Sequence, residues 1–269
     1  MNLFDSIVLG FIQGLTEFLP ISSSGHLVIF QNLLGFSEPQ LLLDVTLHVG
    51  TLLAVVIYFK KDLLAMLSET IGLLRQRCPS NKLAHKNSAV KLLLWIIIAC
   101  VPTGFIGLFF KHPLETMFSS VSTVSVMLLV TGAIIGSTHF IPAGYTSRKE
   151  LGLVTALLVG TAQGLAIIPG ISRSGTTIAC GLLCGLDREL AGRFSFLISI
   201  PAIAGALLVQ LHEQSITSVP LANLAAGFVT SATIGFLCLK ILMAVVKRGR
   251  LAYFAPYCFF AGLMALVLF

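Results

Sequence analysis

Long apolar segments constrain the fold of this sequence more than any other feature. A helix needs about 20 mostly apolar residues to cross the hydrocarbon core of a bilayer. Six runs of this kind cover Leu41–Phe59, Leu92–Phe110, Val121–Phe140, Phe194–Leu211, Leu221–Val246 and Leu251–Phe269. Only 10% of the 269 residues are charged, and mean hydropathy is +0.97, which excludes an ordinary soluble domain. We predict a single all-α integral membrane domain over residues 1–269.

Two further apolar regions, 1–36 and 151–186, are each interrupted halfway. The first break is Pro20–Gly25, and the second is Pro169–Gly175. Each region fits a helix–loop–helix hairpin that enters the membrane and returns to the same side. The predicted fold therefore has six transmembrane helices plus two re-entrant helix hairpins.

The two broken regions are related by a shift of 150 residues. Windows of sixteen residues that begin at Gly10 and Gly160 share eight identities. This similarity predicts internal repeats over 1–140 and 151–269, each made of one hairpin and three crossings. Because three crossings separate the hairpins, the repeat has inverted topology. Inverted repeats with broken helices bring their two irregular loops together near the bilayer midplane.

Basic residues gather in three connections between the apolar runs. Seven Lys and Arg lie in 60–91, three lie in 247–250, and Arg148 and Lys149 lie in a third. By the positive-inside rule these connections are cytoplasmic, so the first hairpin enters from the outside. The chain has a net charge of +6, and the basic residues behind it are concentrated in these connections. They do not form a basic face with interleaved aromatic residues, so we expect no nucleic-acid partner.

The first break holds the polar groups of a candidate site. Gln13 and Glu17 are four residues apart and share one face of a helix. The segment that follows adds Ser22, Ser23, Ser24, Gly25 and His26. Carboxylate, hydroxyl and imidazole groups are costly inside a bilayer, so they indicate function. The start of a second half-helix there offers backbone N–H groups to an anion.

The second break supplies the opposing wall of this site. Its polar residues are Ser172, Arg173, Ser174, Gly175 and Thr177. The planar guanidinium of Arg173 matches phosphate oxygens. Together the two loops predict a phosphate cradle with Glu17 as acid or base and His26 as a proton carrier. The nucleophile is one of Ser22, Ser23 and Ser24.

Structural interpretations stand beside these functional ones. Glu17 and Arg173 could form an ion pair that has no catalytic role, and the serine hydroxyls could simply hydrogen-bond to their own backbone. The GxxxG pairs at Gly10 and Gly160 predict close helix packing, which also permits a homodimer. Another pair, Asp44 and His48, could support the site or mark the membrane interface.

These motifs resemble the undecaprenyl-diphosphate phosphatase family of bacterial membranes, the bacitracin-resistance type. The similar residues are Gln13 with Glu17, Pro20–His26 and Pro169–Ser174. The resemblance implies hydrolysis of undecaprenyl diphosphate to undecaprenyl phosphate and inorganic phosphate, which recycles the lipid carrier of cell-wall synthesis. It implies the bacterial inner (cytoplasmic) membrane, contact with membrane lipids, and a site facing the exterior. The alternative is a phosphate or prenyl-phosphate transporter, because inverted repeats are also typical of transporters.

The resemblance also implies roles for single residues. Ser23 corresponds to the proposed nucleophile, His26 to the proposed histidine, Arg173 to the phosphate-binding arginine, and Glu17 to the acidic residue that holds a divalent cation, Mg²⁺ or Ca²⁺. Many family members have Glu where this chain has Gln13. A cation held by two carboxylates therefore requires another ligand here.

Overall fold

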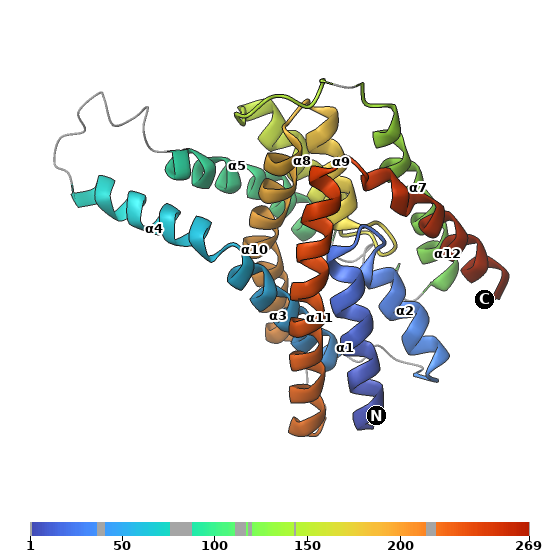
Figure 1. Ribbon diagram of the computed structural model, residues 1–269. Helices are drawn as coiled ribbons and strands as arrows, with labels where there is room; N and C mark the ends of the chain where they lie inside the picture. Colours follow the sequence, from blue (N-terminus) through green and yellow to red (C-terminus); the bar gives the residue numbers. More distant parts are fainter. Residues whose placement is uncertain are drawn as a thin grey trace.

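The computed structural model describes residues 2–36, 41–75, 88–110, 117, 120–142, 144–213 and 219–268. Within these residues every regular element is a helix, as predicted (Figure 1). In chain order the helices are α1 (Leu3–Phe18), α2 (Ser23–Leu33), α3 (Leu41–Tyr58), α4 (Lys60–Arg75), α5 (Ser88–Phe109), α7 (Val121–Ser137), α8 (Leu153–Leu165), α9 (Arg173–Leu183), α10 (Arg188–Glu213), α11 (Leu221–Lys247) and α12 (Ala255–Leu268). Two short 3-10 helices, η1 (Thr138–Phe140) and η2 (Leu251–Phe254), extend α7 and precede α12.

Five of the described helical segments are long and apolar enough to cross a membrane. They correspond to α5, α7 with η1, α10, α11, and η2 with α12. A sixth arises if α3 and α4, which meet at a bend of 70°, are counted as one span. Side chains such as Phe105 and Leu108 of α5 are apolar and more than half exposed, as expected of a surface in contact with lipid.

Helix α4 departs from the prediction. We expected the chain after residue 59 to be a basic connection, but its first part, Lys60–Arg75, is helical. Apolar residues recur at helical spacing along this segment, and Met66 is buried against the rest of the protein. Three of the basic residues of this connection, Arg77, Lys82 and Lys86, lie outside the described residues.

The two broken regions form the predicted pairs of short helices, α1 with α2 and α8 with α9. Figure 1 shows that the pairs occupy opposite ends of the molecule and that their turns meet in its middle. A Cβ atom on Gly25 would lie 3.2 Å from Cα of Gly170, and one on Gly175 would lie 3.1 Å from Cβ of Pro20. In the 150-residue repeat Gly25 corresponds to Gly175 and Pro20 corresponds to Gly170, so the two contacts are equivalent.

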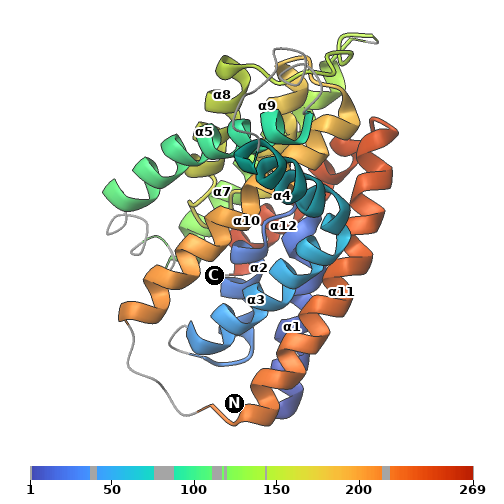
Figure 2. The ribbon, with the colours of Figure 1, turned by 90° about the vertical axis from the view of Figure 1, so that its left-hand side faces the viewer.

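The glycine pairs of the two motifs bring helices into close contact, as predicted. A Cβ atom on Gly10 would lie 2.7 Å from the carbonyl oxygen of Gly227 in α11. One on Gly160 would lie only 2.1 Å from the carbonyl oxygen of Ala99 in α5. Figure 2 shows α1 running beside α11. Each hairpin is therefore fixed against a long helix from the other half of the chain.

The segments that were predicted to be cytoplasmic lie at one end of the molecule. Each of them contacts residues 187–193, at the start of α10, through the paired main chains of Arg148 and Asp187 (2.8 Å), the Lys247–Glu189 salt bridge (2.9 Å) or the Arg193–Asp62 salt bridge. A shared end is what the positive-inside rule requires of these segments.

Candidate active site

Glu17 joins the two breaks of the chain. It lies in the last turn of α1 and is only 7% exposed. Its Oε2 accepts hydrogen bonds from Nε2 of Gln13 at 3.0 Å and from Oγ of Ser23 at 2.5 Å, and its Oε1 accepts one from the guanidinium of Arg173. A buried carboxylate requires such partners. Side chains from α1, α2 and α9 thus converge on one charged group, and the predicted shared face of Gln13 and Glu17 is confirmed.

The two half-helices begin at this point with the same capping geometry. Ser22 is the N-cap of α2, and its Oγ accepts from the N–H of Gly25 at 3.3 Å. Ser172 is the N-cap of α9, and its Oγ accepts from the N–H of Gly175 at 3.1 Å. Helix N-termini carry unsatisfied N–H groups and partial positive charge, so both termini favour a bound anion.

The remaining serines repeat the symmetry of the caps. Oγ of Ser24 lies 3.3 Å from Oγ of Ser22, and Oγ of Ser174 lies 3.3 Å from Oγ of Ser172. Ser22 differs in its backbone, because its φ of +69° is in the left-handed region. Such a conformation costs about 1–3 kcal/mol and is concentrated at functional sites.

Arg173 is the cation of the centre. It is the first residue of α9, and its side chain is 18% exposed. Its salt bridge with Glu17 agrees with the ion-pair interpretation. The pair also lies beside the starts of α2 and α9, whose backbone N–H groups can donate hydrogen bonds to an anion. An anion that enters this point would therefore meet a guanidinium and the N-termini of α2 and α9.

His26 lies beside the centre but points to another helix. Its Nδ1 donates to the carbonyl of Ser22 at 2.8 Å, which leaves Nε2 to accept from the hydroxyl of Tyr257 at 2.8 Å. Tyr257 lies in α12 and stacks on the imidazole, with ring centroids 5.7 Å apart. The sequence contained no signal for this partner, which is 231 residues away.

His48, of α3, is the imidazole that faces Glu17. Its Nε2 lies 4.0 Å from Oε2 of Glu17, and its Nδ1 donates to the carbonyl of Asp44 at 2.7 Å. The carboxylate of Asp44 in turn accepts from Nε2 of Gln31 at 2.7 Å. The approach to Glu17 favours support of the site for His48, whereas both interpretations remain for Asp44.

One predicted threonine and one that was not predicted brace the second loop. Oγ1 of Thr177 donates to the carbonyl of Arg173 at 2.7 Å and contacts Oγ of Ser195 at 2.5 Å. Thr131 of α7 was not predicted: its Oγ1 accepts from the N–H of Ser172 at 3.0 Å and donates to the carbonyl of Gly170 at 2.8 Å. Thr177 therefore positions the start of α9, and Thr131 fixes the loop before it.

The donor set of this centre fits a hard divalent cation. Among the described residues there is no cluster of three or more His, Cys, Asp or Glu side chains that could hold a metal. However, Oε1 of Gln13 is buried without a hydrogen-bond partner, next to the carboxylate of Glu17. Amide, carboxylate and hydroxyl oxygens suit Mg²⁺ or Ca²⁺, and Mg²⁺ sites commonly take their remaining ligands from substrate phosphates.

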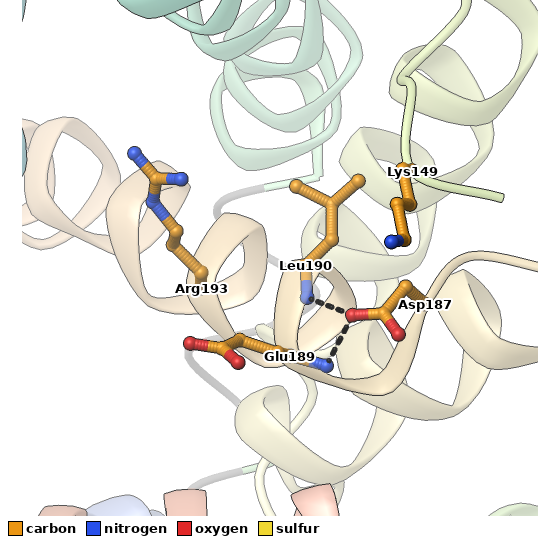
Figure 3. Close-up of a pocket in the computed structure, with 5 residues that line it drawn as sticks. All are labelled: Lys149, Asp187, Glu189, Leu190 and Arg193. Carbon is orange, nitrogen blue, oxygen red and sulfur yellow. Dashed lines mark hydrogen bonds between the residues drawn. The ribbon is translucent and has the colours of Figure 1, made fainter. Parts of the chain in front are cut away.

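A separate pocket of about 210 Å³ lies at the basic end of the molecule (Figure 3). Its lining residues are Lys149, Asp187, Glu189, Leu190 and Arg193. Its acidic groups are engaged, because Asp187 caps α10 through the N–H groups of Glu189 and Leu190, and Glu189 pairs with Lys247. None of the predicted site residues lines this pocket.

Known proteins resemble this chain over its whole length. Residues 6–264 match the family described as bacitracin resistance protein BacA. The undecaprenyl-diphosphatase of Desulfatibacillum aliphaticivorans is 46% identical, with 99% of each chain covered. Those of Desulforapulum autotrophicum (43% identical; 99% of this chain and 98% of the relative) and Methanosphaera stadtmanae (40%; 100% and 98%) are similar. The chain is a multi-pass helical membrane protein that belongs to the bacitracin resistance protein BacA family.

Proposed function

We propose that this protein hydrolyses undecaprenyl diphosphate to undecaprenyl phosphate and inorganic phosphate. The observation that carries the proposal is the convergence of Ser23 and Arg173 on the buried carboxylate of Glu17. The names of its full-length relatives support the same reaction. A carrier of phosphate needs only donors, and a carboxylate beside the anion would repel it. Glu17 is therefore better suited to a hydrolase than to the transporter that we considered as the alternative.

In this proposal the protein first binds the diphosphate. Arg173 and the N-terminal N–H groups of α2 and α9 bind the phosphate oxygens and stabilise the charge that develops on them. A divalent cation, Mg²⁺ or Ca²⁺, held by Glu17 and the amide oxygen of Gln13, would neutralise further negative charge when bound. Phosphoryl transfer depends on positioning and charge more than on covalent chemistry.

The chemical step follows from the hydrogen bond between Ser23 and Glu17. Glu17 takes the proton of Ser23, whose Oγ bonds to the terminal phosphorus as the P–O bond to undecaprenyl phosphate breaks. Water then cleaves the Ser–phosphate bond, which releases inorganic phosphate and restores the hydroxyl. Direct attack by a water molecule that Glu17 activates would use the same charges and leave Ser23 unmodified.

The proposed membrane topology explains how the fold accommodates a lipid substrate. Six spans, with α3 and α4 as one of them, enclose two re-entrant hairpins related by an inverted repeat. The basic end faces the cytoplasm of a bacterial cell, and the site opens to the outside. A long isoprenoid tail then stays in lipid between the helices while its diphosphate reaches the polar centre partway into the membrane.

Phosphate release from undecaprenyl diphosphate tests this proposal. Purified parent protein in detergent, with added Mg²⁺ or Ca²⁺, should release phosphate, and EDTA should stop it. Ser23→Ala should lose at least about 10³-fold in kcat if the serine is the nucleophile. Ser137→Ala is the matched control, because its Oγ only donates to a carbonyl within α7. A folded parent that releases no phosphate with either cation would refute the assignment.

A further inference from the structure

The imidazole of His48 is held in one orientation. Its Nδ1 lies 2.7 Å from the main-chain oxygen of Asp44. A carbonyl oxygen only accepts, so Nδ1 carries the hydrogen, and in the neutral ring Nε2 keeps its lone pair. A histidine that binds a metal through one ring nitrogen almost always donates the N–H of the other ring nitrogen to a carbonyl or carboxylate. His48 has this arrangement.

The free nitrogen of His48 faces a carboxylate across a gap. Nε2 lies 4.0 Å from Oε2 of Glu17. A direct hydrogen bond would need about 2.7–3.2 Å, so these two atoms are not hydrogen-bonded to each other. Oε2 of Glu17 already accepts from Gln13 and Ser23, and a cation in the gap would be attracted both to this oxygen and to the lone pair of Nε2.

A further oxygen without a hydrogen-bond partner lies close to the carboxylate of Glu17. The amide of Gln13 donates to the same Oε2 of Glu17 at 3.0 Å, while its Oε1 is buried without a partner. His26 cannot serve as a ligand in the structure, because its two nitrogens are engaged with Ser22 and Tyr257.

We propose that Nε2 of His48 is a direct ligand of the divalent cation, which sits between His48 and Oε2 of Glu17. This inference rests on the proposed function, because it concerns the cation of that site. The amide oxygen of Gln13 and the phosphates of the substrate supply further ligands. An imidazole ligand shifts the preference of the site toward Mn²⁺ and other transition metals, and away from Ca²⁺, which prefers oxygen ligands alone.

Binding of Mn²⁺ to the purified protein tests the proposal without reference to activity. Methylenediphosphonate, a diphosphate that cannot be hydrolysed, is added to supply the phosphate ligands. Pulsed electron paramagnetic resonance of the parent should show a directly bound ¹⁴N nucleus. In His48→Gln this coupling should disappear, and the Kd for Mn²⁺ should rise by about 10-fold or more. His139→Gln, at an exposed histidine in η1, is the matched control and should retain both properties.

The outcomes separate this inference from the proposed reaction. A ¹⁴N coupling that survives in folded His48→Gln, or that disappears only in His26→Gln, would overturn the role of His48. A parent that binds Mn²⁺ without any ¹⁴N coupling, or that binds none, would overturn it as well. Phosphate release measured on the same samples with Mn²⁺ decides the reaction independently. Phosphate release without ¹⁴N coupling refutes only the role of His48 as a ligand of the cation. Coupling without phosphate release refutes only the proposed hydrolysis.

Discussion

Replacing Glu17 by Gln should separate the two tasks of this side chain. Glu17→Gln keeps the shape but removes the charge that Arg173 pairs with, and that arginine is only 18% exposed. Removing one partner of a buried pair costs about 3–5 kcal/mol, because the other charge is left without compensation. At roughly 2–4 °C per kcal/mol for a protein of this size, the melting temperature should fall by roughly 10 °C.

The same change should strengthen binding of an anion that replaces the lost carboxylate. In the parent, a diphosphate competes with Glu17 for the guanidinium of Arg173. Without that competition the Kd for methylenediphosphonate should fall by about 10-fold, which is about 1.4 kcal/mol. The ligand should therefore raise the melting temperature of Glu17→Gln by a few degrees more than that of the parent. Hydrolysis should be lost in the same variant.

Thermal unfolding in detergent, with EDTA present to exclude cations, measures both effects. Glu189→Gln is the matched control, because Glu189 also accepts from a cation, Lys247, but both side chains are about half exposed. Exposed pairs contribute about 0–1 kcal/mol, so this control should melt close to the parent. If Glu17→Gln has the same melting temperature as the parent, and methylenediphosphonate stabilises both proteins equally, the inferred role of the Glu17–Arg173 pair is wrong.

Two further predictions concern packing and the position of His26. Gly160→Ala should lower stability by about 1–3 kcal/mol, because its Cβ would meet a carbonyl oxygen of α5 at 2.1 Å. Gly104→Ala, with no atom within 4 Å, should be neutral or slightly stabilising, and equal melting temperatures of the two variants would contradict this packing. Tyr257→Phe removes the hydrogen bond that orients His26, the proton carrier expected from the sequence, so kcat for phosphate release should fall about 10-fold. Tyr253→Phe, whose ring contacts a surface arginine, should keep the parent's rate.

Local sequence patterns were sufficient to predict much of the architecture. Apolar length identified five helices that are long enough to span, whereas the predicted run Leu41–Phe59 passes that test only together with α4. The 150-residue shift identified two pairs of short helices with equivalent caps at Ser22 and Ser172. The four-residue spacing of Gln13 and Glu17 predicted their contact, because helical geometry alone places them together. These features depend on neighbours in the sequence, which a single sequence displays directly.

Other parts of the site depend on how distant helices pack. Tyr257 meets His26 only because α12 packs beside α7 and α2 lies against α7 as well, and no spacing in the sequence encodes that arrangement. His48 could be recognised as a polar residue on a spanning helix, but which of its neighbours it faces depends on the rotation of α3 against α1. The helix α4 was missed because its basic ends resembled a solvated loop.

The central claim is that Arg173 and the two half-helix N-termini bind a diphosphate for hydrolysis. Its most direct test is the rate of phosphate release from undecaprenyl diphosphate by Arg173→Ala, with Arg148→Ala, an exposed arginine at the basic end, as the control. We predict that Arg173→Ala loses about 10³-fold or more in kcat, as expected when a charge-stabilising arginine is removed from phosphoryl transfer, and that Arg148→Ala retains the parent's rate. A folded Arg173→Ala variant that releases phosphate as fast as the parent would contradict the account.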